Sequence, residues 1–592
     1  MNGSRDQRRA RRLPHHAVGL ALGAAYLAVL LGTAADVGFA RDEGFYFTAA
    51  RSYQGWFDVL SDAPAQALEP KFIKRFWEYN CEHPALMKTL FGFSERFFHE
   101  KLGWLSAATA LRLPGMVTGA LAIYLLYVFG SFAFGAREGF FAALAFALIP
   151  QPFYHAHLCC FDMAITAFWL LVVYLYWRSL SSTRFGVAAG IAFGFALCVK
   201  LNALFLPLIL GLHYLLLLWW RRRVPASDAG PRPKPWAFVS GLIFAPIIFF
   251  GHWPWLWFDT VQHVGMYLGF HANHPHYNTA YFGENVINAP TPVSYPFVMT
   301  LFTISTVTIV LFFTGAFLRA RHHLGGRWAR FLLERTEPVG PRSRDGLDLL
   351  ILIAGLFPIA LIALPNVPKF GGTKHWMPAM PFIALLAGVG AARLADVAAS
   401  LVRRPPKRIV SAVVLAILLL PPLLETATSH PFGLAFYVPL VGGAPGAASL
   451  GMLRQFWGYT TQGVAPFLNA HVRKGGRVWF HDTAPPSVAM FREEGIIRRD
   501  IRSAGRPEDA DISILHHELH MIHNETWIWN AYRSITPVHV LTYQGVPIVS
   551  VYQRPPKSAA PNKPAAAPSK SALQPKKGGA AAPNESAPQA ER

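Results

Sequence analysis

The sequence predicts a mainly α-helical protein that crosses a membrane many times. Hydrophobic residues make up 53% of the 592-residue chain, charged residues make up only 15%, and the mean hydropathy is +0.29. Apolar runs recur, about eleven in number, and most approach the ~20 residues that a helix needs to cross a bilayer. Short clusters of Lys and Arg separate the runs, so the net charge of +21 indicates membrane topology and argues against nucleic-acid binding.

The membrane domain is predicted over residues 17–424, after a basic tail at residues 1–16. The first span is the apolar run 17–35, which is longer than the ~7–15-residue core of a cleaved signal peptide. The further spans are predicted at 112–133, 139–153, 162–178, 184–199, 201–220, 236–256, 296–318, 347–364, 376–399 and 408–424.

The long loop 36–111 between the first two spans is not simply hydrophilic. Apolar and aromatic residues recur there at helical spacing, from Phe45 to Leu60 and again from Leu86 to Phe98. Helices with one apolar face of this kind lie along a membrane surface. The pattern therefore predicts interfacial helices within this loop.

Basic residues indicate the orientation of the spans. They cluster at Arg178–Arg184, Arg221–Arg223, Arg319–Arg344 and Arg403–Arg408, always on the side that carries the N-terminus. Loops rich in Lys and Arg face the cytoplasm. We therefore expect a bacterial-type plasma (inner) membrane protein with a cytoplasmic N-terminus and with the long first loop outside.

Hydropathy falls after the last span, and residues 425–555 are typical of a small α/β domain. The predicted strands are Val478–Phe480, Ile512–Leu515, Val538–Leu541 and Ile548–Tyr552. Residues 453–471 have the pattern of a helix. The odd number of spans places this domain outside the membrane. Residues 556–592 are rich in Ala, Pro, Lys and Ser, which predicts a disordered tail.

Two acids, Asp42 and Glu43, stand side by side where the chain leaves the first span. Ionisable groups at the mouth of a hydrophobic helix bundle are costly and are commonly functional. The alternative is that they cap the N-terminus of an interfacial helix, where negative charge is favourable. Both interpretations stay open from this pair alone.

Further motifs follow the acidic pair in a fixed order. They are Glu82-His83-Pro-Ala-Leu with Lys88, Arg112-Leu-Pro-Gly, Phe161-Asp162-Met-Ala-Ile-Thr, Val199-Lys200 and Lys374-His-Trp-Met-Pro. Together with the acidic pair, this set resembles the PMT/ArnT-like glycosyltransferases of the GT-C superfamily, which use polyprenyl-phosphate sugars. The resemblance extends over roughly residues 17–400 and implies a GT-C-like membrane domain.

The resemblance also implies an activity. A sugar would pass with inversion from a polyprenyl-phosphate donor to a lipid, polysaccharide or protein acceptor on the outer face, with Asp42 as general base and Glu43 beside it. The residues expected to bind the donor phosphate are His83, Lys88, Arg112, Lys200, Lys369 and Lys374. Glu82 and Asp162 are expected to support them.

Two other functions remain as alternatives. One is a transporter or flippase of a lipid-linked sugar, which would place ionisable groups near the middle of the bilayer. The other is a sensor or assembly subunit whose outer domain does the recognition. The ionisable groups here gather at the outer ends of the spans, which favours the enzyme.

Metal binding and disulfide formation are not decided by the sequence. A divalent cation is compatible with Glu82, His271 or His274, but no ligand spacing supports one. The run His516–His523 lacks the H-E-x-x-H spacing and is expected to form an exposed helix. Of the four cysteines, Cys81 and the Cys159–Cys160 pair are candidates for a disulfide, although buried free thiols are favoured.

Overall fold

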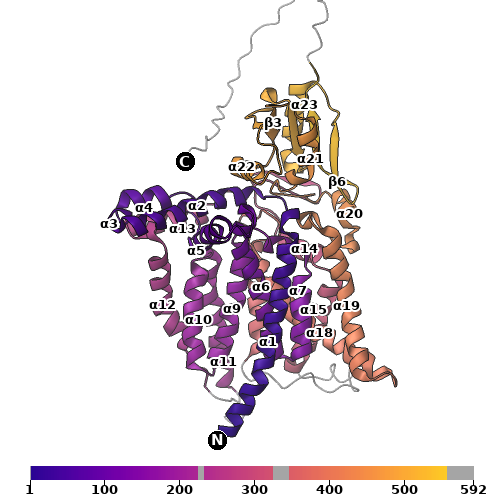
Figure 1. The fold of residues 1–592 in the computed structure, drawn as a ribbon. Coiled ribbons are helices and arrows are strands. Elements are labelled where there is room, and N and C mark those ends of the chain that lie inside the picture. The colour runs from indigo at the N-terminus through magenta and orange to yellow at the C-terminus, as the bar shows by residue number, and fades with distance from the viewer. Residues whose placement is uncertain (1, 224–231, 325–345, 557–592) are drawn as a thin grey trace, which may run out of the picture. The chain divides into compact units, whose positions relative to one another are not determined.

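Helices dominate the computed structural model, which describes residues 2–223, 232–324 and 346–556. A bundle of helices stands side by side, a layer of shorter helices lies across one end of it, and a small sheet lies beyond that layer (Figure 1). We call this the domain end of the bundle. Most of the predicted tail 556–592 and of the basic loop Arg319–Arg344 lies outside the described residues.

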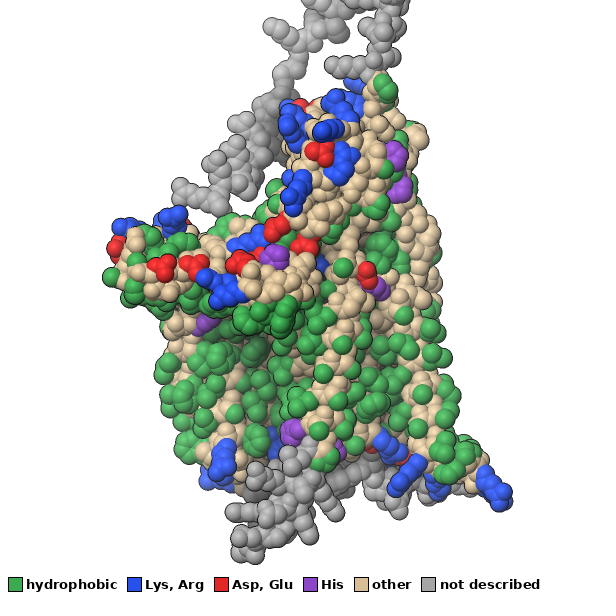
Figure 2. Space-filling view, in the orientation of Figure 1, with side chains coloured by type: hydrophobic (Ala, Val, Ile, Leu, Met, Phe, Trp, Pro, Cys, Tyr) green, Lys and Arg blue, Asp and Glu red, His purple; other side chains and the backbone are tan. Residues whose placement is uncertain are grey.

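The predicted spans coincide with the helices of the bundle. These helices are α1 (Asn2–Thr33), α6 (Ala107–Ala133), α7 (Ala136–Ala147), α9 (Asp162–Ser179), α10 (Thr183–Leu197), α11 (Leu206–Arg221), α12 (Trp236–His252), α14 (Tyr295–Thr303), α15 (Thr306–Leu324), α17 (Leu347–Ala363), α18 (Met380–Leu401) and α19 (Lys407–Ser429). Figure 2 shows hydrophobic side chains over the visible side of the bundle, with Lys and Arg at its two ends.

Length and composition give fewer full spans than the predicted number of about eleven. Within the described residues, five helices qualify, namely α1, α6, α11, α18 and α19, and the pair α14–α15, bent by 113°, makes a sixth candidate. Helices α10, α12 and α17 are apolar but shorter. The predicted span 139–153 was too long because Pro150 begins a separate short helix, α8 (Pro150–Ala156). The chain is nevertheless a multi-pass membrane protein.

The layer across the domain end contains the amphipathic helices expected in the first long loop. They are α2 (Arg41–Asp62), α3 (Pro64–Ala67), α4 (Pro70–Trp77) and α5 (Leu86–Ser94), followed by a π-helical turn (Glu95–Lys101); α13 (Thr260–Ala272) joins them. Tyr53 and Trp56 are buried and pack on Trp77, with ring centroids 4.4 and 5.4 Å away. This layer therefore has an aromatic core of its own.

The C-terminal sheet has five strands in the order β4-β3-β5-β7-β6. The strands are β3 (Arg477–Phe480), β4 (Arg502–Ser503), β5 (Ile512–His516), β6 (His539–Tyr543) and β7 (Val546–Gln553). Strand β3 is parallel to β4 and β5, and β7 is antiparallel to β5 and β6. All four predicted strands are present. A separate hairpin pairs β1 (Thr279–Tyr281) with β2 (Glu284–Val286).

The helix predicted over residues 453–471 is only partly correct. Helix α21 (Thr461–His471) begins late because Trp457 and Gly458 have φ angles of +74° and +61°, which no α-helix contains. The remaining helices are α20 (Gly443–Ser449), α22 (Pro485–Glu493) and α23 (Ile522–Tyr532). Short 3₁₀ turns occur at Ala34–Asp36, Leu201–Phe205, Pro254–Leu256, Met377–Ala379, Gly433–Ala435, Pro439–Val441, Pro507–Asp509 and Leu519–Met521.

The structure also tests the predictions for the His516–His523 run and for the four cysteines. The exposed helix over His516–His523 is wrong, because His516 is buried as the last residue of β5 and pairs with Val549. The four cysteines are free thiols, and three of them are buried, which agrees with the favoured alternative to a disulfide.

The C-terminal domain docks on helix α2 through α22. The Ser487 hydroxyl donates to the Ala40 carbonyl at 3.1 Å, and Arg51 pairs with Glu493 at 2.6 Å. Gly44 lies at the contact, where an added Cβ would come within 2.5 Å of the Ser487 nitrogen. Because the neighbouring atom is backbone, it has little freedom to move away.

Gly44→Ala should therefore destabilise the docking of the C-terminal domain. Overpacking of this kind costs about 1–3 kcal/mol, so the thermal unfolding temperature of the purified protein should fall. Gly32→Ala is the matched control, since nothing lies within 4 Å of an added Cβ in helix α1. Equal unfolding temperatures for the two variants would contradict the close contact.

Candidate functional site

The interaction at the centre of the domain end is an ion pair between Glu43 and Arg112. Arg112 Nε and Nη2 each donate to a different Glu43 carboxylate oxygen at 2.9 Å. Glu43 is 0% exposed and Arg112 is 2% exposed. Glu43 lies in the first turn of α2, and Arg112 lies in the second turn of α6. The pair therefore fastens the interfacial layer to the bundle.

Neither partner has hydrogen-bonding capacity left for a substrate. The other three N–H groups of Arg112 donate to backbone carbonyls, and the two Glu43 oxygens also accept the N–H groups of Ala40 and Cys159, each at 2.9 Å. The carbonyl acceptors are Ala34, Val37 and Gly38, at 3.2, 2.8 and 2.9 Å. All five donors of Arg112 are thus used.

Two sequence predictions change as a result. Arg112 was expected to bind the donor phosphate, but its guanidinium fork already holds a carboxylate. Glu43 was expected to act beside Asp42 in catalysis, but it accepts four hydrogen bonds and cannot reach a substrate. Both residues position the first turn of α2, from which Asp42 projects.

Asp42 is the neighbour that remains accessible. Its side chain is 24% exposed, and its carboxylate lies 3.4 Å from Lys374 Nζ and 3.6 Å from Arg41 Nε. It occupies the first turn of α2, where the helix dipole favours a negative charge. The sequence placed Asp42 and Lys374 in one site, and the structure brings them together.

Lys374 is held by the loop between α17 and α18. Gly371 and Gly372 have φ angles of +64° and +61°, and an added Cβ on Gly371 would lie 2.6 Å from the Lys374 side chain. The ammonium lies over the rings of Phe370 and Trp457, at 4.8 and 3.9 Å. Burial lowers the pKa of Lys374, and the nearby Asp42 carboxylate opposes this effect.

A second Asp–Lys pair completes the site. Lys200 Nζ donates to Asp162 Oδ1 at 2.7 Å, and Asp162 lies in the first turn of α9. Asp162 and Lys200 also act electrostatically on Lys374. We refer to Asp42, Asp162, Lys200 and Lys374 as the charge cluster. Its two acids and two bases come from four separate segments of the chain.

Glu82 and Lys88 of the expected motif form a turn, whereas His83 lies near enough to Lys200 and Lys374 for their charges to act on it. Lys88 is buried and donates to the carbonyls of Asn80 and His83, the latter at 2.8 Å, and burial lowers its pKa to about 7. Glu82 accepts from the Asn80 side chain at 2.6 Å. The His83 ring packs near that of His271, with centroids 5.8 Å apart. Lys88 therefore stabilises this turn.

Lys369 is likewise engaged locally. Its ammonium donates to the carbonyls of Leu364 and Val367 at 3.0 and 3.3 Å, within its own loop. Within the described residues, its ammonium makes no hydrogen bond or ion pair with the charge cluster. The structure thus supports Lys200 and Lys374 as cations near Asp42 and assigns Lys88, Lys369 and Arg112 to structural contacts.

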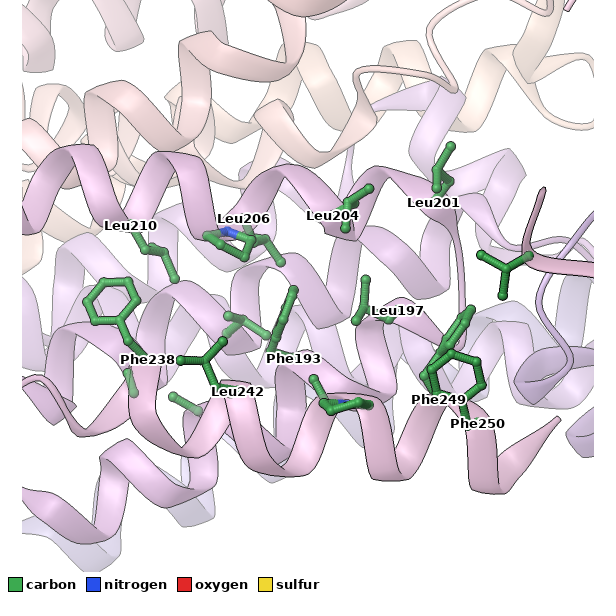
Figure 3. Close-up of a pocket in the computed structure, with 18 of the residues that line it drawn as sticks. Phe193, Leu197, Leu201, Leu204, Leu206, Leu210, Phe238, Leu242, Phe249 and Phe250 are labelled. Atoms are coloured by element: carbon green, nitrogen blue, oxygen red, sulfur yellow. The ribbon is translucent and has the colours of Figure 1, made fainter. Parts of the chain in front are cut away.

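An apolar groove lies between helices of the bundle. It has a volume of about 570 Å³ and runs between α10, α11 and α12, from Phe238 and Leu210 at one end to Leu201 and Phe250 at the other (Figure 3). Leu201, at one end of the groove, directly follows Lys200 of the charge cluster in the chain.

Sequence reasoning missed the residues that connect the cluster to the C-terminal domain. Arg41 pairs with Asp482 at 2.8 Å and also lies beside Asp42. Trp457 carries Lys374 on its ring. Arg41 could have been found from the sequence, because it is a basic residue directly before Asp42. The sequence around Asp482 and Trp457 contains no motif that indicates a role.

Metal ligands were left undecided by the sequence. In the parts of the chain that the structure describes, no group of three His, Cys, Asp or Glu side chains is placed to hold a metal ion. His271 Nε2 lies 3.0 Å from the carbonyl of Glu82, and His274 Nδ1 lies 3.1 Å from that of Pro275. The two candidate histidines are therefore each engaged with a backbone carbonyl through one ring nitrogen, and Glu82 accepts from the Asn80 side chain.

Comparisons with known proteins agree with the predicted resemblance. Residues 98–255 match the family model of dolichyl-phosphate-mannose-protein mannosyltransferases, so the resemblance is confirmed over this part of the chain. This range contains Asp162 and Lys200 but not Asp42. No curated protein matches the sequence.

Two solved structures that align with this chain have low sequence identity to it. ArnT from Cupriavidus metallidurans bound to undecaprenyl phosphate is 15% identical, with 90% of this chain and 97% of that chain covered and a TM-score of 0.44. The oligosaccharyltransferase of Archaeoglobus fulgidus in the apo form is 14% identical, with 69% and 55% covered and a TM-score of 0.41.

Glu43→Gln should destabilise the protein strongly. It leaves the Arg112 guanidinium buried without its counter-charge, and breaking a buried pair in this way costs about 3–5 kcal/mol. Arg112→Lys should do the same, because one ammonium cannot replace five donors. Thermal unfolding of the purified variants checks this, with Asp42→Asn as the neighbouring control that should unfold like the wild type. A stable Glu43→Gln variant would contradict the structural role.

Proposed function

We propose that this chain is a membrane glycosyltransferase that moves a sugar from a polyprenyl-phosphate donor to a lipid, polysaccharide or protein acceptor. The observation that carries the proposal is the placement of Asp42 beside Lys374, at 3.4 Å, in a chain that also has an apolar groove starting one residue after Lys200. A carboxylate, cations and a lipid-sized groove are the three parts that this reaction needs. The family match over residues 98–255 supports the same class.

Asp42 is the general base of the proposed reaction. It is the accessible carboxylate of the cluster, and it takes the proton from the acceptor hydroxyl as that oxygen attacks the anomeric carbon. General-base assistance contributes about 10²–10⁴-fold to a rate. The Glu43–Arg112 pair contributes by fixing the first turn of α2.

Lys200 and Lys374 stabilise the departing polyprenyl phosphate. Negative charge grows on the phosphate in the transition state, and preorganised cations in a site poor in water are effective there. Lys200 stays in place because Asp162 holds it at 2.7 Å. Lys374 stays in place because the Gly371–Gly372 turn and two aromatic rings surround it.

The groove between α10, α11 and α12 holds the isoprenoid tail in this proposal. Its lining is aliphatic and aromatic, and its end at Leu201 lies next to Lys200. A donor whose tail follows the groove brings its phosphate to the charge cluster. The position of the charge cluster also disfavours the flippase alternative. Its four ionisable side chains lie at one end of the bundle, whereas a carrier would place such groups near the middle of the bilayer.

The proposed location is a bacterial-type inner membrane with a cytoplasmic N-terminus. The basic residues Arg184, Arg221 and Arg408 lie at helix ends opposite the domain end, and such residues mark cytoplasmic loops. The charge cluster and the C-terminal domain then face the extracytoplasmic side, where a flipped polyprenyl-phosphate sugar is presented.

Asp42→Asn should abolish transfer while the protein stays folded. Loss of the base predicts a rate lower by at least about 100-fold. The measurement is mass spectrometry of membrane glycolipids and surface glycans from cells that express either the wild type or the variant in place of the chromosomal copy. The wild type should add a mass of one sugar to a class of molecules, and the variant should not.

Asp62→Asn is the matched control, because Asp62 lies at the other end of the same helix and is exposed. It should leave the glycan profile unchanged. If the Asp42→Asn cells keep the wild-type profile, the proposed role of Asp42 is wrong. If cells with and without the protein show identical profiles, the proposed function itself is wrong.

Gly241→Leu should obstruct the groove. Gly241 lines it, and an added Cβ has its nearest neighbour, a Phe193 ring atom, at 3.6 Å, so a longer side chain enters the open space. Once a donor is identified, its KM should rise at least about tenfold for the long-chain form and change little for a short-chain analogue. Gly251→Leu, on the same helix with nothing within 4 Å, is the control. Equal effects on both donors would exclude the groove as the tail site.

A further inference from the structure

A second cavity lies beside Arg41, between the Lys374 loop and the C-terminal domain. Its volume is about 290 Å³, close to the lower end of the ~300–1,000 Å³ that small-molecule sites occupy. Residues that line it include Arg41, Phe370, Trp457, Asp482, Glu518 and Asn524. They belong to the interfacial layer, to the Lys374 loop and to the C-terminal domain. We call it the domain cavity.

Two buried carboxyl groups face this cavity. The side chains of Asp482 and Glu518 are each only 2% exposed, and they lie against one another. Asp482 Oδ1 accepts from Arg41 at 2.8 Å, and Glu518 Oε2 lies 3.3 Å from His520. The second oxygens, Asp482 Oδ2 and Glu518 Oε1, are also buried, and a side-chain hydrogen bond joins the two carboxyl groups.

Arg41 offsets part of the charge of the two acids, since it lies 2.8 Å from Asp482. Burial and the neighbouring Asp482 raise the pKa of Glu518 well above its ordinary value, and burial also raises the pKa of Asp482. Carboxyl oxygens accept hydrogen bonds from sugar hydroxyls.

Aromatic and amide groups complete the lining. Phe370 and Trp457 supply flat apolar surfaces, and Asn524 supplies an amide beside the acids. An apolar wall with a few placed polar groups is typical of a small-ligand site. The same two aromatic rings carry Lys374. The cavity and the charge cluster therefore share a wall.

Arg41 links the cavity directly to the proposed base. Its guanidinium lies 2.8 Å from Asp482 and 3.6 Å from Asp42. A sugar bound in the cavity would contact Arg41, whose guanidinium also lies beside Asp42. The apolar groove is lined by different residues.

We propose that the domain cavity is the acceptor subsite and that it binds one neutral, hexose-type sugar unit, with the Asp482–Glu518 pair hydrogen-bonded to its hydroxyls. The assignment rests on the proposed glycosyltransferase function. A sugar-binding acceptor subsite means that the acceptor is a glycan or glycolipid and not an unglycosylated peptide. It also gives the C-terminal domain a defined role, since that domain supplies both acids.

The test is binding of soluble sugars to the purified full-length protein, in a detergent without a sugar head group. The probes are methyl glucoside, methyl galactoside and methyl mannoside, with methyl glucosaminide as a cationic comparison, followed by saturation-transfer NMR and by tryptophan fluorescence. At least one neutral hexoside should bind the wild type. Glu518→Leu should weaken it at least about tenfold, because two hydroxyl contacts are lost.

Glu518→Gln should bind within about threefold of the wild type, since an amide keeps a donor and an acceptor in the same place. Asp509→Asn, on the exposed surface of the same domain, should bind as the wild type does. Thermal unfolding of each variant separates loss of binding from loss of folding. If Glu518→Leu does not fold, Asn524→Leu takes its place, since it removes the amide from the cavity lining and should also weaken hexoside binding.

Several results would overturn the assignment. They are the absence of hexoside binding to the wild type, binding that Glu518→Leu leaves intact, and tighter binding of the glucosaminide that Glu518→Gln abolishes, which would indicate a cationic ligand. Asp42→Asn should bind hexosides normally. The glycan profiles of Asp42→Asn cells therefore test the proposed function separately, and the subsite can fail while that function stands.

Discussion

The arrangement of the domain end depends on the buried Glu43–Arg112 pair. Burying two charges costs several kcal/mol per ion, and their attraction recovers this only when every remaining donor and acceptor is satisfied. Here all five guanidinium N–H groups and both carboxylate oxygens are satisfied. The pair therefore contributes little to the net free energy of folding. A fold that left either charge buried without its partner would, however, be strongly destabilised. The pair accordingly specifies one position for the first turn of α2.

That constraint explains how two adjacent acids acquire different roles. On a helix, neighbouring residues point about 100° apart, so when Glu43 turns into the bundle, Asp42 must turn away from it. The carboxylate of Asp42 is thereby directed to the boundary between the bundle and the C-terminal domain, where Lys374 meets it. The alternative that the acids cap a helix is also partly right, because Glu43 accepts the Ala40 N–H in the first turn of α2.

Much of the fold follows from the sequence, because apolar periodicity determines where helices form and alternation determines where the C-terminal strands form. Asp42, Asp162, Lys200 and Lys374 were all among the ten site residues that the family resemblance implied, and the structure brings these four together. The role of Arg112 could not be predicted from the sequence. A guanidinium fork suits a phosphate and a carboxylate equally well, and only the folded chain shows which one it meets. The same limit applies to Lys88 and Lys369, whose partners are backbone carbonyls without a sequence signature.

The charges of the cluster suit a reaction in which a proton and a negative charge move in opposite directions. Under the proposed mechanism, Asp42 loses its charge when it accepts the proton of the acceptor, and the departing phosphate gains charge in the same step. Lys374, at 3.4 Å from Asp42, then loses one anionic partner as another forms. The cluster therefore keeps a constant electrical balance, and a cation that is held rigidly needs little reorganisation. This requires Lys374 to be fixed by groups other than Asp42, and Phe370, Trp457 and the Gly371–Gly372 turn meet that requirement.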